Sequence, residues 1–214
     1  MLGIHDYWLF VAAGVLLNLT PGQDSLFIIG RALSGGTRAG VAAACGICVG
    51  SVGHTLAAAF GLSLILATSA LAFTIVKLLG AAYLVYLGAR LLLAKPTASA
   101  AVAAPGVSGA STATTARAVF FQGVLTNLLN PKVALFFLAF LPQFVDVGSG
   151  ARTLAFLALG ATFITTGLAW CLVLALAAGR LQAFFLRNPD ARTLLDRAVG
   201  ALFIALGARL AWTR

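Results

Sequence analysis

The sequence predicts an all-α integral membrane protein with six transmembrane helices, arranged as two inverted three-helix repeats in which helices 1 and 4 are broken at proline. Three observations predict this fold: an apolar composition, six long apolar runs, and motifs that recur in both halves. Of the 214 residues, 61% are hydrophobic and only 9% are charged, whereas soluble domains average about 25% charged residues. We therefore expect a single membrane domain over residues 1–214 and no soluble catalytic domain.

Six apolar runs are long enough to cross a bilayer as helices. They cover approximately residues 7–29, 39–66, 71–92, 118–143, 153–178 and 194–212. Between the third and fourth runs lies a tract of Ala, Ser, Thr, Pro and Gly with hardly any charge, which predicts a flexible linker. We expect the first repeat to cover residues 1–92, the linker residues 93–116, and the second repeat residues 117–214.

The basic residues indicate membrane topology. The chain carries 14 Lys and Arg against five acidic residues, a net charge of +9. These residues fall at the ends of apolar runs and not on one stripe, so we expect no nucleic-acid partner. If the N-terminus is outside, four basic residues lie outside and nine inside, the nine being Arg31, Arg38, Arg90, Lys95, Arg117, Arg180, Arg187, Arg192 and Arg197. The positive-inside rule therefore predicts that both termini are outside.

Two motifs recur between the halves of the chain. Leu-Gly-Ala-Arg at residues 87–90 returns at residues 206–209, and the Asn-Leu-Thr-Pro of the first run is matched by Asn-Leu-Leu-Asn-Pro in the fourth. Because each half holds an odd number of spans, the second half must enter the membrane upside down relative to the first. This is the inverted-repeat plan of many secondary transporters.

Proline breaks the helix in the first and fourth runs. It lacks an N–H and clashes with the preceding turn, but it suits the first position of a new helix. Thr20 precedes Pro21, with Gln23 completing a capping box, and Asn130 precedes Pro131. We expect two half-helices in each run, with the two positive N-terminal ends converging near mid-membrane on a site able to hold a carboxylate. The alternative is a pair of ordinary proline kinks.

Asp24 and Lys132 each lie in the first turn after a predicted break. A charge at this depth costs about 2.5 to 3.5 kcal/mol on insertion scales, so each needs a partner or a function. One interpretation is a salt bridge that holds the two repeats together. In the other, Asp24 binds a substrate ammonium or a proton, while Lys132 and the half-helix ends hold a carboxylate.

Further polar residues surround these breaks. Amide side chains lie close to both prolines, and His54 lies in the second run on a helix whose Gly46, Gly50 and Gly53 offer a packing face. His54 is either a proton relay or a histidine that is hydrogen-bonded within the bundle. The predicted substrate-binding or proton-coupling residues are Asn18, Thr20, Pro21, Gly22, Gln23, Asp24, His54, Asn127, Asn130, Pro131 and Lys132. We expect no metal and no cofactor.

Along nearly its whole length the chain resembles the LysE/RhtB family of amino-acid exporters. The resemblance rests on the stretches at residues 19–22, 30–40, 77–88, 121–132 and 140–144. It implies that the protein is no enzyme and exports amino acids or close derivatives across the bacterial inner membrane, driven by proton exchange. In that membrane the two termini, which the basic residues predict to be outside, are periplasmic. A homo-oligomer is left open. Many relatives have Pro-Asn where this chain has Gln23-Asp24, and their acidic residue in the second span is absent, with Ser51 near its place.

The alternative function is a transmembrane thiol–disulfide electron carrier. Cys45 and Cys48 form a Cys-x-x-Cys pair in the second run, a spacing that redox proteins use. Two features oppose this interpretation: both cysteines lie on one face of one predicted helix, and no cysteine adjoins either proline break. A membrane-embedded enzyme is disfavoured further, because the sequence has no Glu, only two His, and no catalytic cluster.

Overall fold

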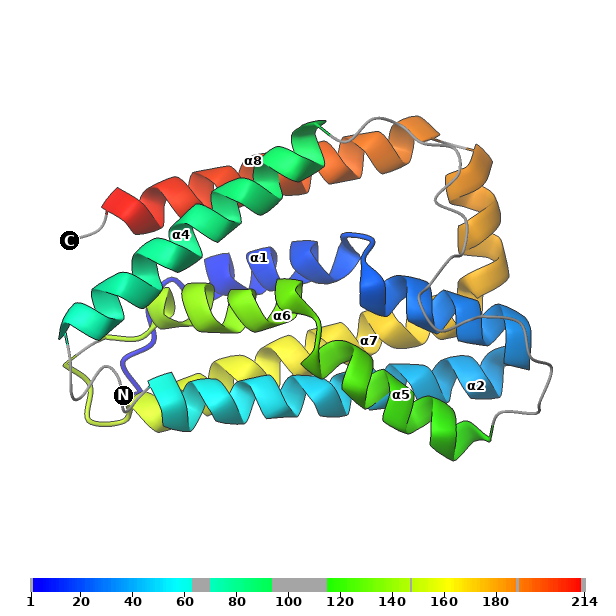
Figure 1. Cartoon of the computed structure of the whole chain (residues 1–214), viewed down its shortest axis with the longest axis horizontal. Coiled ribbons are helices and arrows are strands. Elements are labelled where there is room, and N and C mark those ends of the chain that lie inside the picture. Colours follow the sequence, from blue (N-terminus) through cyan, green and yellow to red (C-terminus); the bar gives the residue numbers. More distant parts are fainter. Residues whose placement is uncertain (1, 63–69, 94–114, 147, 188, 213–214) are drawn as a thin grey trace.

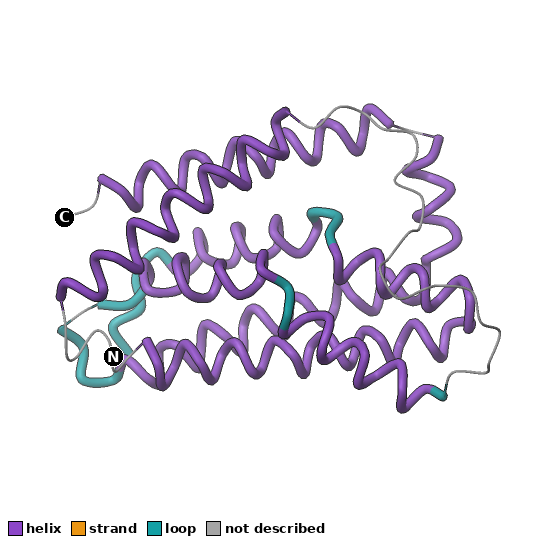
Figure 2. The backbone as a smooth tube through the Cα atoms, viewed as in Figure 1, coloured by secondary structure: helices purple, strands orange, loops and turns teal. Residues whose placement is uncertain are grey.

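The computed structural model describes residues 2–62, 70–93, 115–146, 148–187 and 189–212. Within these ranges the chain is almost wholly helical, with one isolated β-bridge between Ile4 and Val145 (Figures 1 and 2). The elements in order are α1 (Tyr7–Leu19), α2 (Gln23–Leu56), the π-helix η1 (Ala57–Leu62), α4 (Ala70–Leu93), α5 (Ala116–Leu128), α6 (Pro131–Leu135), the π-helix η2 (Phe136–Phe140), the 3₁₀ helix η3 (Leu141–Phe144), α7 (Arg152–Arg187) and α8 (Pro189–Trp212).

The first predicted run is broken where expected, but the prediction of a loop after it is wrong. We predicted that the first span ends near residue 29 and the second begins near residue 39. Instead, α2 starts at Gln23 and continues to Leu56, with Gly36 at φ 76° and ψ 178° inside it. Figure 1 shows that the chain reverses direction at this point. One glycine therefore replaces the expected loop, because only glycine adopts this backbone conformation without strain.

The remaining predicted runs agree more closely with the structure. The fourth run is broken as predicted, with a bend of 47° between Ala116–Leu128 and Pro131–Phe144. The third and sixth runs correspond to α4 and α8, although α8 begins five residues earlier than predicted, at Pro189. The fifth was predicted to end at residue 178, where α7 is kinked at Ala177, but the helix continues to Arg187. Most of the predicted linker, residues 94–114, lies outside the described residues.

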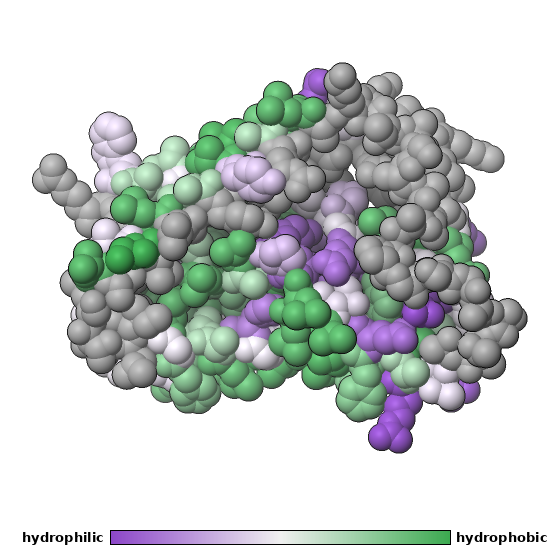
Figure 3. All heavy atoms as spheres, in the orientation of Figure 1, coloured by the Kyte–Doolittle hydropathy of each residue, from purple (hydrophilic) through white to green (hydrophobic). Residues whose placement is uncertain are grey.

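Long apolar helices and an apolar surface are features of a membrane protein. Two described segments, Gln23–Leu62 and Arg152–Arg180, are long and apolar enough to cross a membrane, and the bent pair Ala116–Leu128 with Pro131–Phe144 makes a third if it is one span. Large side chains such as Trp8 and Phe60 are more than 60% exposed. On the face shown in Figure 3, apolar residues cover most of the described surface. Such a surface suits lipid better than water.

Glycines allow α2 and α5 to pack with their backbones nearly in contact. A Cβ on Gly46 would overlap the carbonyl oxygen of Phe120, and one on Gly50 would lie 2.7 Å from the Cβ of Asn127. From the other side, a Cβ on Gly123 would lie 2.7 Å from the carbonyl oxygen of Ala43. The predicted packing face of Gly46, Gly50 and Gly53 is confirmed, and it fits the use of small residues between membrane helices.

The recurring Leu-Gly-Ala-Arg motifs lie on α4 and α8, which are antiparallel neighbours (Figure 1). A Cβ on Gly88 would lie 2.5 Å from the carbonyl oxygen of Gly200 and 2.7 Å from the side chain of Ile204. A Cβ on Gly207 would lie 2.8 Å from both the carbonyl oxygen of Ala81 and the side chain of Val85. Gly207 lies 119 positions after Gly88. The partners of Gly88, Gly200 and Ile204, likewise lie 119 positions after the partners of Gly207, Ala81 and Val85. The contact is therefore reciprocal.

Two apolar clusters fill the interior. The first is rich in aromatic residues and includes Phe10, Phe136, Phe140 and Phe163. The second consists of smaller aliphatic residues around Phe27 and is formed by Ile28, Ala43, Ala44, Ile47, Val119, Cys171, Leu174 and Ala175. Along α1–α2 and along α7, the residues between the two clusters include polar side chains. The core is therefore interrupted by a polar layer.

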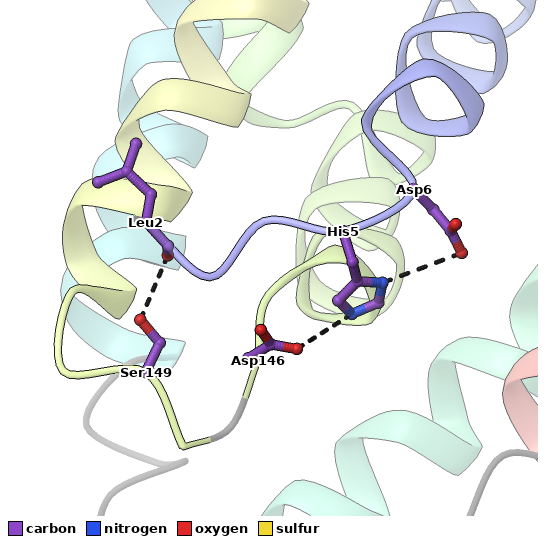
Figure 4. Close-up of polar contacts among 5 residues, drawn as sticks. All are labelled: Leu2, His5, Asp6, Asp146 and Ser149. Carbon is purple, nitrogen blue, oxygen red and sulfur yellow. Dashed lines mark hydrogen bonds and ion pairs between the residues drawn. The ribbon is translucent and has the colours of Figure 1, made fainter.

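The N-terminal residues are tied to the segment that follows η3 (Figure 4). The Asp146 N–H donates to the Gly3 carbonyl at 2.8 Å, and the His5 N–H donates to the Phe144 carbonyl at 3.1 Å. The His5 ring lies between two carboxylates, 3.9 Å from Asp6 and 3.8 Å from Asp146. We call residues 2–6, 144–146 and 148–149 the terminal strap. It joins the start of one broken helix pair, α1–α2, to the end of the other, α5–η3.

Candidate functional site

The two helix breaks converge at the centre of the molecule, as predicted. At the second break, Asn130 caps α6 by accepting a hydrogen bond from the Lys132 backbone N–H at 3.0 Å, and Pro131 is the first residue of the helix. At the first break, a Cβ on Gly22 would lie 3.0 Å from the ammonium nitrogen of Lys132. Residues about 110 positions apart in the sequence therefore meet.

The predicted capping box at the first break is wrong. Thr20 is the C-cap of α1, and its hydroxyl donates to the Leu16 carbonyl at 2.8 Å. The N-cap of α2 is Gly22, which has no side-chain cap, and Gln23 is exposed. The physical reason is local: the end of α1 leaves carbonyls without partners, and a threonine hydroxyl readily donates to the carbonyl four residues back. Pro21 therefore lies between the helices and not at the first position of α2.

A chain of hydrogen bonds joins the first half to the second at Asp24. The Asn127 amide donates to one Asp24 carboxylate oxygen at 2.8 Å, and the Ser51 hydroxyl donates to the Asn127 amide oxygen at 3.2 Å. Asn127 is 1% exposed. His54 contacts the same residue through a 3.0 Å hydrogen bond between its Nε2 and the Asn127 carbonyl, and its ring stacks on Phe137. His54 is therefore hydrogen-bonded within the bundle.

Lys132, from the second half of the chain, contacts the first half at the end of α1. Its ammonium donates to the Thr20 carbonyl at 3.1 Å and to the Leu17 carbonyl at 3.3 Å. These carbonyls form the C-terminal end of α1, where the helix dipole is negative and a cation is stabilised. Asp24, in the first turn of α2, lies at a positive helix end. Both charges therefore occupy helix ends that favour them.

A cleft opens beside these residues, between α1, α2, α5, α6 and α7. It encloses about 480 Å³, including space open to solvent. Its polar lining comes from Asn18, Asp24, Ser25, Ser51, Asn127 and Lys132, and its apolar lining from Leu17, Ile47, Val133, Phe163, Ile164 and Trp170, with Gly167, Cys48 and Cys171 completing it. A mainly apolar cleft with a few polar groups is typical of a small-molecule site.

Three polar atoms in the cleft are buried without a hydrogen-bond partner in the described structure. They are the Asn18 amide nitrogen, the Asp24 carboxylate oxygen that Asn127 does not contact, and the Trp170 indole nitrogen. Buried polar groups in native proteins are nearly always paired, and an unpaired one costs about 1–3 kcal/mol. Two donors and one anionic acceptor are therefore available to a polar ligand.

The cleft separates the predicted site residues into two groups. Asn18, Asp24, Asn127 and Lys132 line it. The others are not among its lining residues: those of the breaks shape the backbone, and His54 lies behind Asn127. The prediction missed Trp170. Its position in the sequence could have indicated it, because tryptophan is usually found at the membrane interface, where its N–H can bond to water, and Trp170 lies well inside an apolar run.

The cysteine pair in contact is different from the one that the sequence suggested. The Cys48 side chain lies beside that of Cys171 on α7, and both residues line the cleft. Cys45 is partly exposed and is not among the residues that line the cleft. No group of three or more His, Cys, Asp or Glu residues suited to a metal ion occurs in the part of the chain that the structure describes.

A helical membrane protein with a small cleft that carries a few polar groups, at the meeting point of two broken helices, has the features of a small-molecule transporter. Comparison with known proteins identifies the family. Residues 15–214 match the LysE type translocator family, and the chain belongs to this family of multi-pass membrane transport proteins.

Several relatives cover nearly the whole chain. An uncharacterised membrane protein of Pseudomonas aeruginosa is 35% identical over 98% of this chain and 96% of that protein. A membrane protein of Vibrio cholerae is 32% identical over 97% of each chain. The leucine efflux protein of Salmonella typhimurium is 29% identical over 98% of this chain and 96% of its own length. No solved structure matches the chain significantly.

Proposed function

We propose that this protein exports amino acids or close derivatives from the bacterial cytoplasm across the inner membrane, as a proton-coupled secondary transporter. The observation that carries the proposal is the cleft at the two helix breaks, which is lined by a residue with an acidic group, one with an ammonium group and two with unpaired N–H donors. An amino acid presents the complementary groups. The relatives named leucine efflux proteins support the same class of substrate.

The proposal includes six spans in two inverted repeats, residues 1–92 and 117–214. Two contacts support this symmetry. Gly88 of α4 and Gly207 of α8 occupy equivalent positions in the two repeats, and each packs against equivalent residues of the other helix. Asp24 contacts the end of α5, while Lys132 contacts the end of α1. Opposed rocking of the two repeats about the breaks would expose the cleft to each side of the membrane in turn.

Proton coupling is assigned to Asp24 because its carboxylate is the acidic group that lines the cleft and one of its oxygens has no partner. A proton and a substrate ammonium would compete for this oxygen, since both are held by its negative charge. Such competition is what exchange requires: protonation releases the amino acid outside, and deprotonation inside allows the next one to bind. Both termini are placed in the periplasm by the distribution of basic residues.

The test is efflux of labelled amino acids from proteoliposomes, with and without an imposed proton gradient. We expect gradient-dependent efflux of one chemical class of amino acid by the unmodified protein. Asp24→Asn should abolish it, because the amide cannot exchange a proton or bind an ammonium as strongly. The matched control is Asp146→Asn, which makes the same change at an exposed position outside the cleft and should retain efflux.

Two results would overturn the proposal. The first is correctly folded protein that exports no amino acid of the panel, which would remove amino acids as the substrate. The second is full gradient-driven efflux by Asp24→Asn, which would remove Asp24 from the coupling mechanism. Folding of each variant is checked by size-exclusion chromatography in detergent before reconstitution.

A further inference from the structure

The cleft has chemically different ends. Asp24 belongs to α2 and is hydrogen-bonded to Asn127 of α5. The two unpaired donors belong to the other helices of the cleft, Asn18 to α1 and Trp170 to α7. An anionic acceptor on one pair of helices and neutral donors on another pair therefore belong to residues that line the same space. A ligand that satisfies all three groups must carry both a cationic donor and an acceptor with at least two lone pairs.

The two donors lie at one contact between α1 and α7. A Cβ on Gly167 would lie 3.3 Å from the Asn18 amide nitrogen, so this nitrogen lies over Gly167. Trp170 follows Gly167 by three residues, and residues three apart share a helix face. All three residues line the cleft. The absence of a side chain at Gly167 leaves room for the Asn18 amide.

The chemistry of these donors fits a carboxylate. An indole N–H can only donate, and a carboxylate can only accept, through two oxygens. Hydrogen bonds to an ionised acceptor are roughly twice as strong as those between neutral groups. The Lys132 ammonium, to which the sequence assigned this function, already donates to the carbonyls of Leu17 and Thr20. Its charge still favours an anion in the cleft.

The rest of the lining limits the substrate side chain. Ile47, Val133, Phe163 and Ile164 supply apolar surface around the polar groups. Burial of a branched aliphatic side chain against such residues is favourable, because it removes apolar surface from water. A cationic side chain would instead meet the Lys132 ammonium. The cleft therefore suits an aliphatic amino acid.

We infer that Trp170 binds the substrate carboxylate through its indole N–H, together with the Asn18 amide, and that Asp24 binds the substrate ammonium, so that the site selects aliphatic amino acids with a free carboxylate. This inference rests on the proposed function. Trp170 is thereby a specificity residue of the second half of the chain, positioned opposite the acidic residue of the first half.

The experiment compares leucine with leucinamide, which keeps the ammonium and the side chain but lacks the carboxylate. Both compounds compete with labelled leucine for the purified protein in lipid nanodiscs, at a pH where the leucinamide amine is protonated. Binding is measured, and not efflux, because leucinamide crosses lipid without a carrier. We expect the unmodified protein to prefer leucine by at least about tenfold, since a hydrogen bond to a charged group contributes about 1.5–3 kcal/mol.

Trp170→Phe removes the N–H and keeps an aromatic ring. We expect leucine to bind roughly tenfold more weakly, with leucinamide changed less than about twofold, so that the preference is largely lost. Trp8→Phe is the matched control, because Trp8 is 78% exposed and lies outside the cleft. A structural role for Trp170 would weaken both ligands equally, and this result would overturn the inference.

A second variant covers failure of Trp170→Phe to fold. Asn18→Asp replaces the unpaired donor with a carboxylate oxygen of nearly the same shape, so leucine should bind at least about tenfold more weakly while leucinamide is retained. An unmodified protein that binds leucine and leucinamide equally would overturn the inference and leave amino-acid export standing. A folded protein that neither binds nor exports any amino acid would overturn both.

Discussion

The two helix breaks have similar sequences but are held in different ways. At the second break, the Asn130 side chain caps α6 and Pro131 starts the helix, so local residues stabilise the new helix end. At the first break, no side chain caps α2. The carbonyl groups at the end of α1 instead accept hydrogen bonds from Lys132, which belongs to the other half of the chain. The second break is stabilised locally, whereas the first depends on a tertiary contact. The first should therefore be the more sensitive to movement of one half against the other.

The largest expected effect follows from removing this tertiary contact. Lys132→Met leaves the Leu17 and Thr20 carbonyls without their donor, and each buried carbonyl left unpaired costs about 1–3 kcal/mol. We expect a lower free energy of unfolding and a lower midpoint of thermal unfolding in detergent. Arg117→Met is the control, because Arg117 is an exposed basic residue of α5, which precedes the second break. Equal midpoints for the two variants would contradict the dependence of the first break on Lys132.

The second prediction concerns the contact between α4 and α8, where the two halves of the chain have equivalent packing. Gly88→Ala and Gly207→Ala place a Cβ 2.5 and 2.8 Å from backbone carbonyl oxygens of the opposite helix. Overpacking of this kind typically costs about 1–3 kcal/mol, and the reciprocal geometry predicts similar losses at both positions. Gly61→Ala is the control, because a Cβ there has no neighbour within 4 Å. A large loss at only one of the two glycines, measured by thermal unfolding, would show that the α4–α8 contact is not symmetric.

A smaller difference separates the two residues that precede the prolines. Asn130→Ala removes an N-cap, which costs about 1 kcal/mol. Thr20→Val keeps the side-chain shape and removes only a hydroxyl that donates back to Leu16, so we expect a smaller loss. Free energies of unfolding in a denaturant series provide the comparison. Equal losses in the free energy of unfolding for the two variants would contradict this difference and favour the N-cap role that the sequence suggested for Thr20.

The smallest expected effect is at the terminal strap, which links the outer ends of the two broken helix pairs. His5→Ala removes contacts to Asp6 and Asp146, but all three side chains are about half exposed, and exposed ion pairs contribute at most about 1 kcal/mol. We expect little change in the unfolding midpoint and faster hydrogen exchange at the Asp146 amide. An unchanged exchange rate would mean that the backbone hydrogen bonds alone hold the strap.

The sequence predicted the parts of this fold that depend on local chemistry. Asn130 and Pro131 have the residue types that favour an N-cap and the first position of a helix, and Gly46 and Gly50 predict close helix packing. Thr20 was ambiguous, because its hydroxyl can serve the helix before it or the helix after it, and in the structure it donates to the Leu16 carbonyl of the helix before it. The proximity of Asn18 to Gly167 and Trp170 could not be predicted, since residues about 150 positions apart meet only through the packing of α1 on α7.

The turn at Gly36 has a consequence for the genetics of this protein. A Cβ at this position would meet no atom within 4 Å, so a map of contacts would class the position as tolerant. Its φ of 76° with ψ of 178° is a conformation that is essentially restricted to glycine. In a library of all single codon changes, position 36 should therefore be depleted of nearly every substitution, including alanine, although no neighbouring atom opposes them.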